Sequence, residues 1–172
     1  LQRSTGLATL TPMHRLDRET GGLLLLAIKP DARAHYHRLF AEAMIEREYL
    51  AVAHIEEAPG QRRWRVENRI APGEPWYRQQ IAEGPANAVT EIELLDLREG
   101  AGLFRLLPKT GRKHQLRIHM VSIGFPIIGD PFYPKIRARR DGDPPLQLLA
   151  SRLAFIDPLS RAPRCFTSVR QL

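Results

Sequence analysis

The carboxylate of Asp17 lies among cations and hydrogen-bonding side chains in the segment 14–22. The apolar run 23–28 follows directly; it is too short to cross a membrane and predicts a buried strand. Asp17 would therefore lie where a rigid strand begins, and loops at strand ends often carry reacting groups. A carboxylate in such a place can act as a nucleophile or stabilise charge. The alternative is an Asp that only shapes the Gly-rich turn through hydrogen bonds to its own backbone.

Three further segments carry chemically useful side chains, at 47–52 (Arg-Glu-Tyr-Leu-Ala-Val), 110–119 (Thr-Gly-Arg-Lys-His-Gln-Leu-Arg-Ile-His) and 126–133 (Pro-Ile-Ile-Gly-Asp-Pro-Phe-Tyr). Together with 14–22, and in this order, they resemble the motifs of the RluA-type RNA pseudouridine synthases. The resemblance extends from about Pro12 to Phe155. Four ordered motifs are far more specific than one short motif. The resemblance implies an enzyme that detaches uracil from its ribose and rejoins it through carbon.

The resemblance also implies roles for individual residues. Asp17 matches the essential nucleophile, and Arg117 matches the arginine whose planar donors pair with that carboxylate. Tyr49 matches the tyrosine that stacks against the uracil and handles a proton. Ile118 matches an aliphatic position that could form a floor for the base, and plain helix packing explains it nearly as well. Attack on the sugar C1′, attack on the base C6 and elimination to a glycal all stay open.

The same motifs contain His14, Arg15, Lys113 and His114, which are candidate contacts for the RNA substrate. A target base in folded RNA must be unstacked first, which costs a few kcal/mol. Arg15 could occupy the vacated space or hold a phosphate; alternatively it only orders its turn. Two positions depart from the family pattern: Gly21 stands where Ser is common, and Lys113 where Thr is common. Lys113 opposes the dipole of a following helix, a mismatch that an RNA phosphate could offset.

Positive charge favours a polyanionic partner. The chain has 26 Lys and Arg against 19 Asp and Glu, a net charge of +7. Arg62, Arg63 and Arg65 surround Trp64, and 135–140 forms a second basic cluster. Such clusters can hold phosphates while an aromatic ring stacks on a base. The alternative is that both clusters are solvated loops, with Trp64 packed against the sheet.

Several classes of site and location are disfavoured. Cys165 is the single cysteine, so an intrachain disulfide is impossible and we expect a reducing, cytoplasmic setting. The histidine spacings make no convincing metal pair, and Gly21-Gly22 lacks the pattern and the Lys of a nucleotide-binding loop. We therefore expect no metal, no cofactor, no membrane span, and a monomer whose partner is structured RNA, either ribosomal or transfer RNA.

Two helices are predicted around these motifs. Asp31 can cap a helix with the body 32–46. Thr110 offers an N-cap, and Gly124 a C-terminal stop, for a second helix. Arg117 of that helix can point away from the core, because the residues expected on the apolar side are Leu116, Met120 and Ile123.

The strands predict the fold class. Residues 47–55 alternate as a strand does, and 88–98 with 103–107 have the pattern of a hairpin. The Pro- and Gly-rich segment 56–88 should hold only short strands and exposed loops, and a last strand is expected near 147–155. The composite is an α+β domain with a mixed, mostly antiparallel, twisted sheet and flanking helices. The resemblance adds a central active-site cleft.

A chain of 172 residues can bury roughly 70% of its unfolded surface, so we expect a single catalytic domain. The resemblance implies an N-terminal strand with a Lys-Pro-x-Gly element and often an accessory RNA-binding domain, and we expect this chain to lack both. Two rival functions stay open. Loss of Asp17, Tyr49 or Arg117 would support a non-catalytic RNA-binding module, but all three are present. A glycosidase acting on nucleosides would need a second acid, and Glu19 is the nearby candidate.

Overall fold

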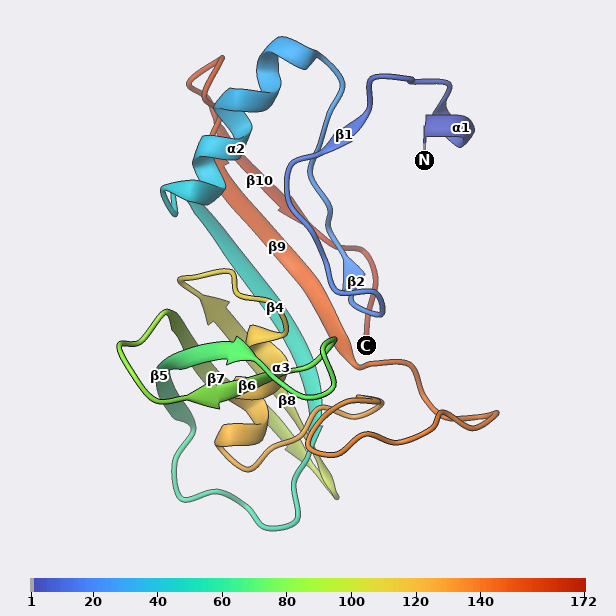
Figure 1. Ribbon diagram of the computed structural model, residues 1–172, viewed down its shortest axis with the longest axis vertical. Coiled ribbons are helices and arrows are strands. Elements are labelled where there is room, and N and C mark those ends of the chain that lie inside the picture. The colour runs from blue at the N-terminus through green and yellow to red at the C-terminus, as the bar shows by residue number, and fades with distance from the viewer. Residues whose placement is uncertain (1) are drawn as a thin grey trace.

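The computed structural model describes residues 2–172 and is built around one large sheet (Figure 1). In this part of the chain the sheet has eight strands, in the order β10-β9-β4-β8-β7-β5-β6, with β2 added beside β9. The pairing of β2 with β9 is parallel, and the other pairings are antiparallel. The predicted α+β class with a mixed, mostly antiparallel sheet is therefore confirmed.

The elements follow one another with short helices between long strands. Their bounds, in chain order, are α1 (Gln2–Thr5), β1 (Thr11–Pro12), β2 (Gly21–Gly22), β3 (Leu26–Ala27), a 3-10 turn (Pro30–Ala32), α2 (Arg33–Ala41), β4 (Ile45–His54), β5 (Arg63–Pro72), β6 (Gln79–Ala82), β7 (Ala88–Arg98), β8 (Ala101–Pro108), α3 (Gln115–Ser122), β9 (Leu148–Ile156) and β10 (Pro163–Thr167). Among residues 2–172, none of the helices combines the length and the apolar character that spanning a bilayer requires.

Strand β4 runs between β8 and β9 and carries Tyr49. The alternation predicted for 47–55 is confirmed: Ala51 and Ala53 are fully buried in the main core. Against β9 the register shifts between Glu48 and Tyr49, which marks a bulge directly before the tyrosine. Bulges re-aim the side chains that follow them, and periodicity in the sequence does not reveal them.

Helix α3 begins at Gln115, later than predicted. Thr110 does not cap it, because the hydroxyl of Thr110 donates to Oε1 of Gln115 at 2.7 Å and accepts the amide of Val89 at 2.9 Å. His114 takes the N-cap position instead, with a left-handed φ of 55°. The predicted stop is confirmed, since Gly124 follows the helix with a φ of +88°. The segment 110–114 is consequently a loop.

The apolar side of α3 packs on the sheet as predicted. Leu116 and Met120 lie in the main core with Phe104 and Leu106 of β8, and Ile123 packs against the same cluster. This core fixes the height and rotation of α3 over the sheet, so it also fixes where the polar residues of the helix point.

Helix α2 ends at Ala41, and the predicted body 32–46 is too long. Asp31 does not cap it; the N-cap is Ala32, which makes no side-chain cap hydrogen bond. After Ala43 adopts a left-handed φ of 52°, the chain turns and Ile45 opens β4. The second core cluster, which joins α2, β4 and β9, consists of Leu39, Ile45, Leu153 and Phe155.

The run 23–28 is not the buried strand that its composition predicted. Leu26–Ala27 alone forms a strand there, paired with β1, and Ile28 is 51% exposed. Leu23 and Leu25 are partly buried against the second core cluster. A short apolar run marks burial on one side of the chain, but strand pairing depends on partners that lie elsewhere in the sequence.

The two glycines before this run attach the Asp17 loop to the sheet. Strand β2 pairs Gly21 with Leu149 and Gly22 with Ala150. Gly22 has a φ of +104°, and a Cβ there would lie 2.3 Å from the carbonyl oxygen of Ala150. Only glycine tolerates both the backbone angle and the close approach. The loop that carries Asp17 is therefore anchored at this end by backbone contact with β9.

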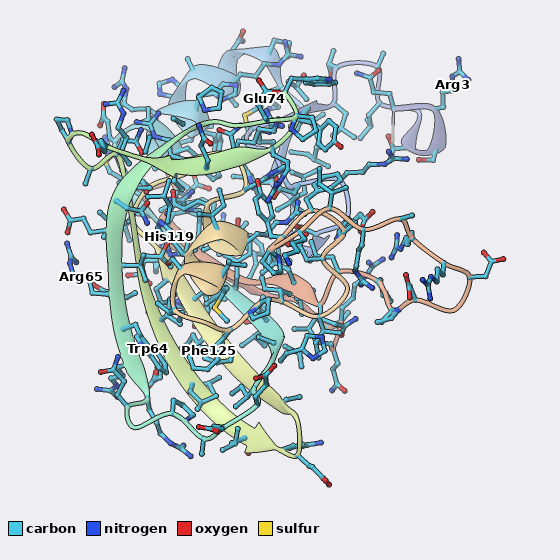
Figure 2. All side chains as sticks on the ribbon, turned by 60° about the horizontal axis from the view of Figure 1, so that its bottom comes forward. Arg3, Trp64, Arg65, Glu74, His119 and Phe125 are labelled. Carbon is cyan, nitrogen blue, oxygen red and sulfur yellow. The ribbon has the colours of Figure 1, made fainter. Side chains whose placement is uncertain are left out.

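The segment 56–88 holds one long strand, β5, rather than only short ones. Strand β5 pairs with β7 for most of its length. Trp64 of β5 is half-buried against Phe104 and Phe125 (Figure 2), which confirms the alternative that this tryptophan packs against the sheet. The predicted hairpin is also confirmed, as β7 and β8.

Candidate active site

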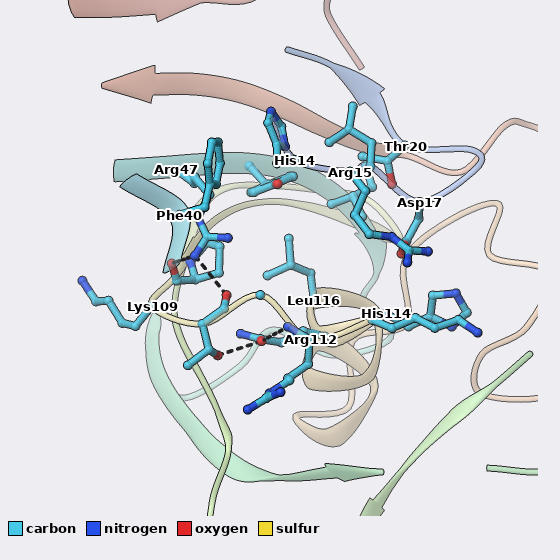
Figure 3. A pocket seen from close by; sticks show the side chains of 18 of the residues that line it. His14, Arg15, Asp17, Thr20, Phe40, Arg47, Lys109, Arg112, His114 and Leu116 are labelled. Atoms are coloured by element: carbon cyan, nitrogen blue, oxygen red, sulfur yellow. Dashed lines mark hydrogen bonds between the residues drawn. The ribbon is translucent and has the colours of Figure 1, made fainter. Parts of the chain in front are cut away.

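A pocket of about 620 Å³ lies where the loop 13–20, the end of α2, the start of β4 and the segment 108–116 meet. In Figure 3, Asp17 and His114 lie at one end of it, and Arg47 and Lys109 at the other. Its volume falls in the range of roughly 300–1,000 Å³ that is usual for small-molecule sites. Both Asp17 and Tyr49 line it, so two of the three predicted catalytic residues share one cavity.

Behind this pocket, Arg117 lies between two carboxylates. Its Nη1 is 3.7 Å from Oδ2 of Asp17, so the predicted pairing of the two side chains is present. Arg117 makes its two-point contact with Asp130, through Nε to Oδ2 at 2.8 Å and Nη2 to Oδ1 at 2.5 Å. The side chains of Arg117 and Asp130 are 4% and 1% exposed, and that of Asp17 is 18% exposed. Arg117 is therefore buried against these two carboxylates, whereas the residues of α3 that enter the main core are Leu116 and Met120.

Asp130 is the functional candidate that sequence reasoning missed. Its Oδ1 also accepts the backbone amides of Phe132 at 2.8 Å and Tyr133 at 3.1 Å, so the carboxylate caps its own turn. Asp130 lies in the motif 126–133, and a Gly-Asp-Pro turn is a signal for an Asx cap. Nothing local indicates that Arg117, thirteen residues earlier, is the second partner.

The charges around Asp17 have opposing effects on its acidity. Burial raises the pKa of Asp17 above its ordinary value of 3.8; the cations of Arg117 and Arg15 lower it, and the nearby carboxylate of Asp130 raises it. The result is a carboxylate that is more basic than an exposed aspartate. A more basic carboxylate is a better nucleophile and a better proton acceptor.

Tyr49 reaches the pocket from the bulge in β4. Burial raises the pKa of its phenol above 10.0, against the lowering effect of Arg47, and the charge of Asp17 raises it further. Its hydroxyl makes no hydrogen bond to any residue of the described chain, 2–172. Tyr49 therefore offers a flat ring and a protonated hydroxyl to whatever occupies the pocket.

Arg47 forms the wall of the pocket beside Tyr49. Its Nη2 donates to the carbonyl oxygens of Pro108 at 3.3 Å and Thr110 at 3.1 Å, which ties β4 to the loop 110–114. Its Nε is buried and finds no partner within residues 2–172. Arg47 belongs to the recognised motif around Tyr49, but the sequence assigned no role to it.

The two predicted histidines line the pocket in a neutral form. Burial lowers the pKa of His14 and of His114 to about 4 in each case. Nε2 of His14 accepts the backbone amide of Leu25 at 3.0 Å, so this ring holds the Asp17 loop against the run that follows it. Nδ1 of His114 lies 2.9 Å from the hydroxyl of Tyr133. Contact of either ring with RNA stays a prediction.

The predicted cations divide between the pocket and a distant strand. Arg15 and Lys113 line the pocket, together with Arg47, Lys109 and Arg112, which were not predicted. Arg62, Arg63 and Arg65, in contrast, lie at or just before the start of β5 and do not line it. Of these, Arg63 pairs with Glu93 at 2.8 Å and Arg65 with Glu67 at 3.2 Å. Their binding to RNA stays a prediction.

Ile118 does not line this pocket. It is buried in a third cluster with Ile70, Ala88 and Tyr133, which agrees with the alternative of helix packing. Leu116, two residues earlier on α3, lines the pocket instead.

Glu19, the one acid that a glycosidase could use near Asp17, forms an ion pair with Arg139 at 3.2 Å. This contact ties the Asp17 loop to the basic segment 135–140 and turns the Glu19 carboxylate toward a cation. Within residues 2–172, no group of three His, Cys, Asp or Glu side chains is placed to hold a metal ion.

This site occurs in a chain whose residues 1–122 match the model of a family described as RNA pseudouridylate synthase. The chain belongs to that family. A dual-specificity RNA pseudouridine synthase RluA of Pasteurella multocida is 37% identical over 154 residues, which cover 87% of this chain and 68% of that protein. An uncharacterised RNA pseudouridine synthase of Haemophilus influenzae is 37% identical over 123 residues, 72% of this chain and 54% of that protein. The predicted RluA-type resemblance is therefore confirmed.

Solved structures agree with this membership. The human RNA pseudouridylate synthase domain containing 1 superposes with a TM-score of 0.78 at 26% identity, over 94% of this chain and 69% of the other. The human RNA pseudouridylate synthase domain containing 4, at 24% identity, has the same fold with a TM-score of 0.71, over 99% of this chain and 75% of the other. The chain spans between about half and two thirds of the length of the curated relatives that it matches.

Proposed function

We propose that this chain isomerises uridine to pseudouridine in structured RNA, ribosomal or transfer RNA, with Asp17 as the nucleophile. The observation that carries the proposal is the largely buried carboxylate of Asp17 at the pocket edge, 3.7 Å from the guanidinium of Arg117. Membership of the pseudouridylate synthase family supports the reaction class, and the relatives' names support RNA as the substrate class.

The reaction breaks the bond between N1 of uracil and C1′ of the ribose and forms a bond between C5 and C1′. The hydrogen at C5 leaves as a proton and N1 gains a proton, so nothing is oxidised and no water is consumed. Asp17 supplies the electron pair, whether it attacks C1′, attacks C6 or accepts a proton in elimination to a glycal. Burial in the pocket favours the neutral form of the carboxylate, and the charge of Arg117 opposes this and favours the ionised form.

Tyr49 completes the site on the other side of the base. Its ring offers a stacking surface, and its raised pKa keeps the hydroxyl protonated at neutral pH, ready to exchange a proton at the sugar or the base. Unstacking the target uridine costs a few kcal/mol. The cations that line the pocket can offset this by neutralising flanking phosphates, and they are Arg15, Arg47, Lys109, Arg112 and Lys113.

The proposal is tested by mapping pseudouridine chemically in total RNA from cells that lack the gene, complemented with native protein or with Asp17→Asn. We expect one or a few modified sites to disappear in the mutant cells and to return with the native protein alone. Asp31→Asn is a matched control, because it makes the same chemical change at an exposed aspartate that caps nothing. Restoration of the sites by Asp17→Asn would refute the assigned nucleophile.

The products separate this reaction from its rivals. Isomerised RNA keeps its mass, whereas a glycosidase releases uracil and leaves an abasic site. A non-catalytic module binds RNA and leaves every uridine unchanged. The ion pair of Glu19 with Arg139 weighs against the glycosidase, because a second catalytic acid must be free to exchange its proton.

A further inference from the structure

Trp76 is 82% exposed, although it lies in a loop that the structure holds in place. The loop 73–78 joins β5 to β6 and is closed by two backbone hydrogen bonds, from Gly73 to Arg78 at 3.3 Å and from Arg78 to Pro75 at 2.8 Å. Figure 2 shows this connection, with Glu74 labelled as its acidic residue. An indole that is left in solvent on a closed loop contributes little to the fold, and its flat ring and N–H are free to contact a ligand.

Two long-range contacts fasten the base of the loop. The backbone amide of Gln79 donates to the hydroxyl of Tyr133 at 2.8 Å, and Nη2 of Arg78 donates to the carbonyl oxygen of Pro134 at 3.0 Å. The guanidinium of Arg78 also lies 4.9 Å from the ring centre of Tyr133. The position of Trp76 is therefore set by the same segment that supplies Asp130, and a preorganised ring loses little entropy on binding.

Aromatic rings and a cation connect Trp76 to the pocket. Trp76 packs edge-on against Tyr77 at 5.8 Å, Tyr77 contacts Phe132 at 5.1 Å, and Phe132 lies 5.9 Å from the ring of His114, which lines the pocket. Nζ of Lys113, another pocket-lining residue, is 5.9 Å from the centre of the Trp76 ring. The exposed ring of Trp76 is thus separated from the candidate active site by one side chain, that of Lys113.

We propose that Trp76 is a stacking platform for an unpaired base of the RNA substrate, next to the uridine held in the pocket, with Lys113 on the phosphate between them. The proposal rests on the proposed function, because it takes RNA as the substrate. A flat exposed ring beside an ammonium group, at the rim of a pocket lined by cations, is complementary to a single-stranded nucleotide in both shape and charge. Within the loop 73–78, Glu74 carries a charge opposite to that of Lys113.

Tryptophan fluorescence tests this directly, since Trp64 and Trp76 are the two tryptophans of the chain and Trp64 is half-buried against the main core. The probe is a 12-nucleotide single-stranded RNA of mixed sequence, titrated into protein that carries Asp17→Asn so that no turnover occurs. We expect quenching when Trp76 is the single emitter, in the Trp64→Phe protein, and none in the Trp76→Phe protein. Inorganic polyphosphate, which has charge but no bases, should not quench.

Affinity supplies the second measurement. Stacking on an aromatic ring is worth about 1–3 kcal/mol per base, so Trp76→Ala should raise the Kd for the same RNA by about 5- to 150-fold. Trp76→Phe keeps a ring and should lose only a small part of this. Leu159→Ala, which truncates another exposed apolar side chain outside the pocket lining, should bind as the parent does.

A Kd for Trp76→Ala within twofold of the parent, or equal quenching by polyphosphate and RNA, would overturn the platform. These binding measurements do not depend on catalysis. The platform can therefore fail while the isomerisation stands, and RNA can still stack on Trp76 if the reaction proves to be a different one.

Discussion

Replacement of Asp130 by Asn should move the acid limb of the pH–rate profile to lower pH. The reaction needs Asp17 ionised, so its rate falls as the pH drops through the pKa of Asp17. Burial and the charge of Asp130 raise that pKa, and Arg117 lowers it. Asp130→Asn removes the like charge and releases Arg117 from its two-point contact, and both changes lower the pKa of Asp17.

The size of the shift follows from the spacing of the charges. At an effective dielectric constant of about 20, two unit charges 3.7 Å apart, as in the contact of Arg117 with Asp17, interact by about 4 kcal/mol. Asp130 contacts other nitrogens of the same guanidinium, and its charge is the smallest of the named influences on the pKa of Asp17, so its removal should have a smaller effect than this. With relaxation and solvent screening, we expect the acid limb to move down by about one pH unit.

The rate on the neutral plateau should fall as well, on the order of 10- to 100-fold, because Arg117 loses the partner that fixes its plane and a less basic carboxylate is a weaker nucleophile. Single-turnover rates on an RNA that contains the target uridine, measured from pH 4 to pH 9, give both the position of the acid limb and the plateau rate. Asp130→Glu is the matched control: it keeps the charge, so its acid limb should stay in place even if its rate falls. An acid limb of Asp130→Asn that stays in place or moves to higher pH would refute the reasoning.

Two further changes test neighbouring parts of the site. Arg15→Gln removes an exposed cation that lowers the pKa of Asp17, so its acid limb should move in the opposite direction, to higher pH, in the same single-turnover assay, with little effect on the unfolding temperature. Gly22→Ala should lower the free energy of unfolding in urea by about 2–4 kcal/mol, because its Cβ would meet the backbone of β9 at 2.3 Å and its φ is +104°. In the control Gly60→Ala, where nothing lies within 4 Å of the added Cβ, the free energy of unfolding should change by less than about 0.5 kcal/mol. Equal losses in the two variants would contradict this account.

Elements with a local period could be predicted from the sequence, and elements that depend on distant partners could not. The alternation of β4 and the hairpin β7–β8 are visible in consecutive residues, and both were placed within a few residues of their bounds. The sequence misplaces the start of α3, because the hydroxyl of Thr110 bonds Gln115 and Val89, and Val89 lies on the distant strand β7. The run 23–28 wrongly predicts one buried strand, because composition shows burial but not pairing.

The candidate site also has features that the sequence predicts and features that it does not predict. The resemblance placed Asp17, Tyr49 and Arg117 together, and the structure brings all three to one pocket or its back wall. The sequence does not predict the burial of Arg117, because α3 is buried on two sides, by the main core and by the cluster that contains Tyr133. A helix with one apolar stripe predicts one buried face, whereas in α3 all residues from Gln115 to Met120 are buried.

The sharing of Arg117 between two carboxylates resolves a conflict in the proposed chemistry. A nucleophilic carboxylate in a closed pocket needs a cation to stay ionised, but a full two-point ion pair would occupy its oxygens and lower its basicity. Asp130, almost completely buried and held by two backbone amides, takes the two-point contact and fixes the guanidinium. Asp17 receives the remaining nitrogen at 3.7 Å, close enough for charge stabilisation and too long for a strong hydrogen bond. Its oxygens therefore stay available to the substrate, so the division of one guanidinium between a structural and a reacting carboxylate accounts for both the ionisation and the reactivity of Asp17.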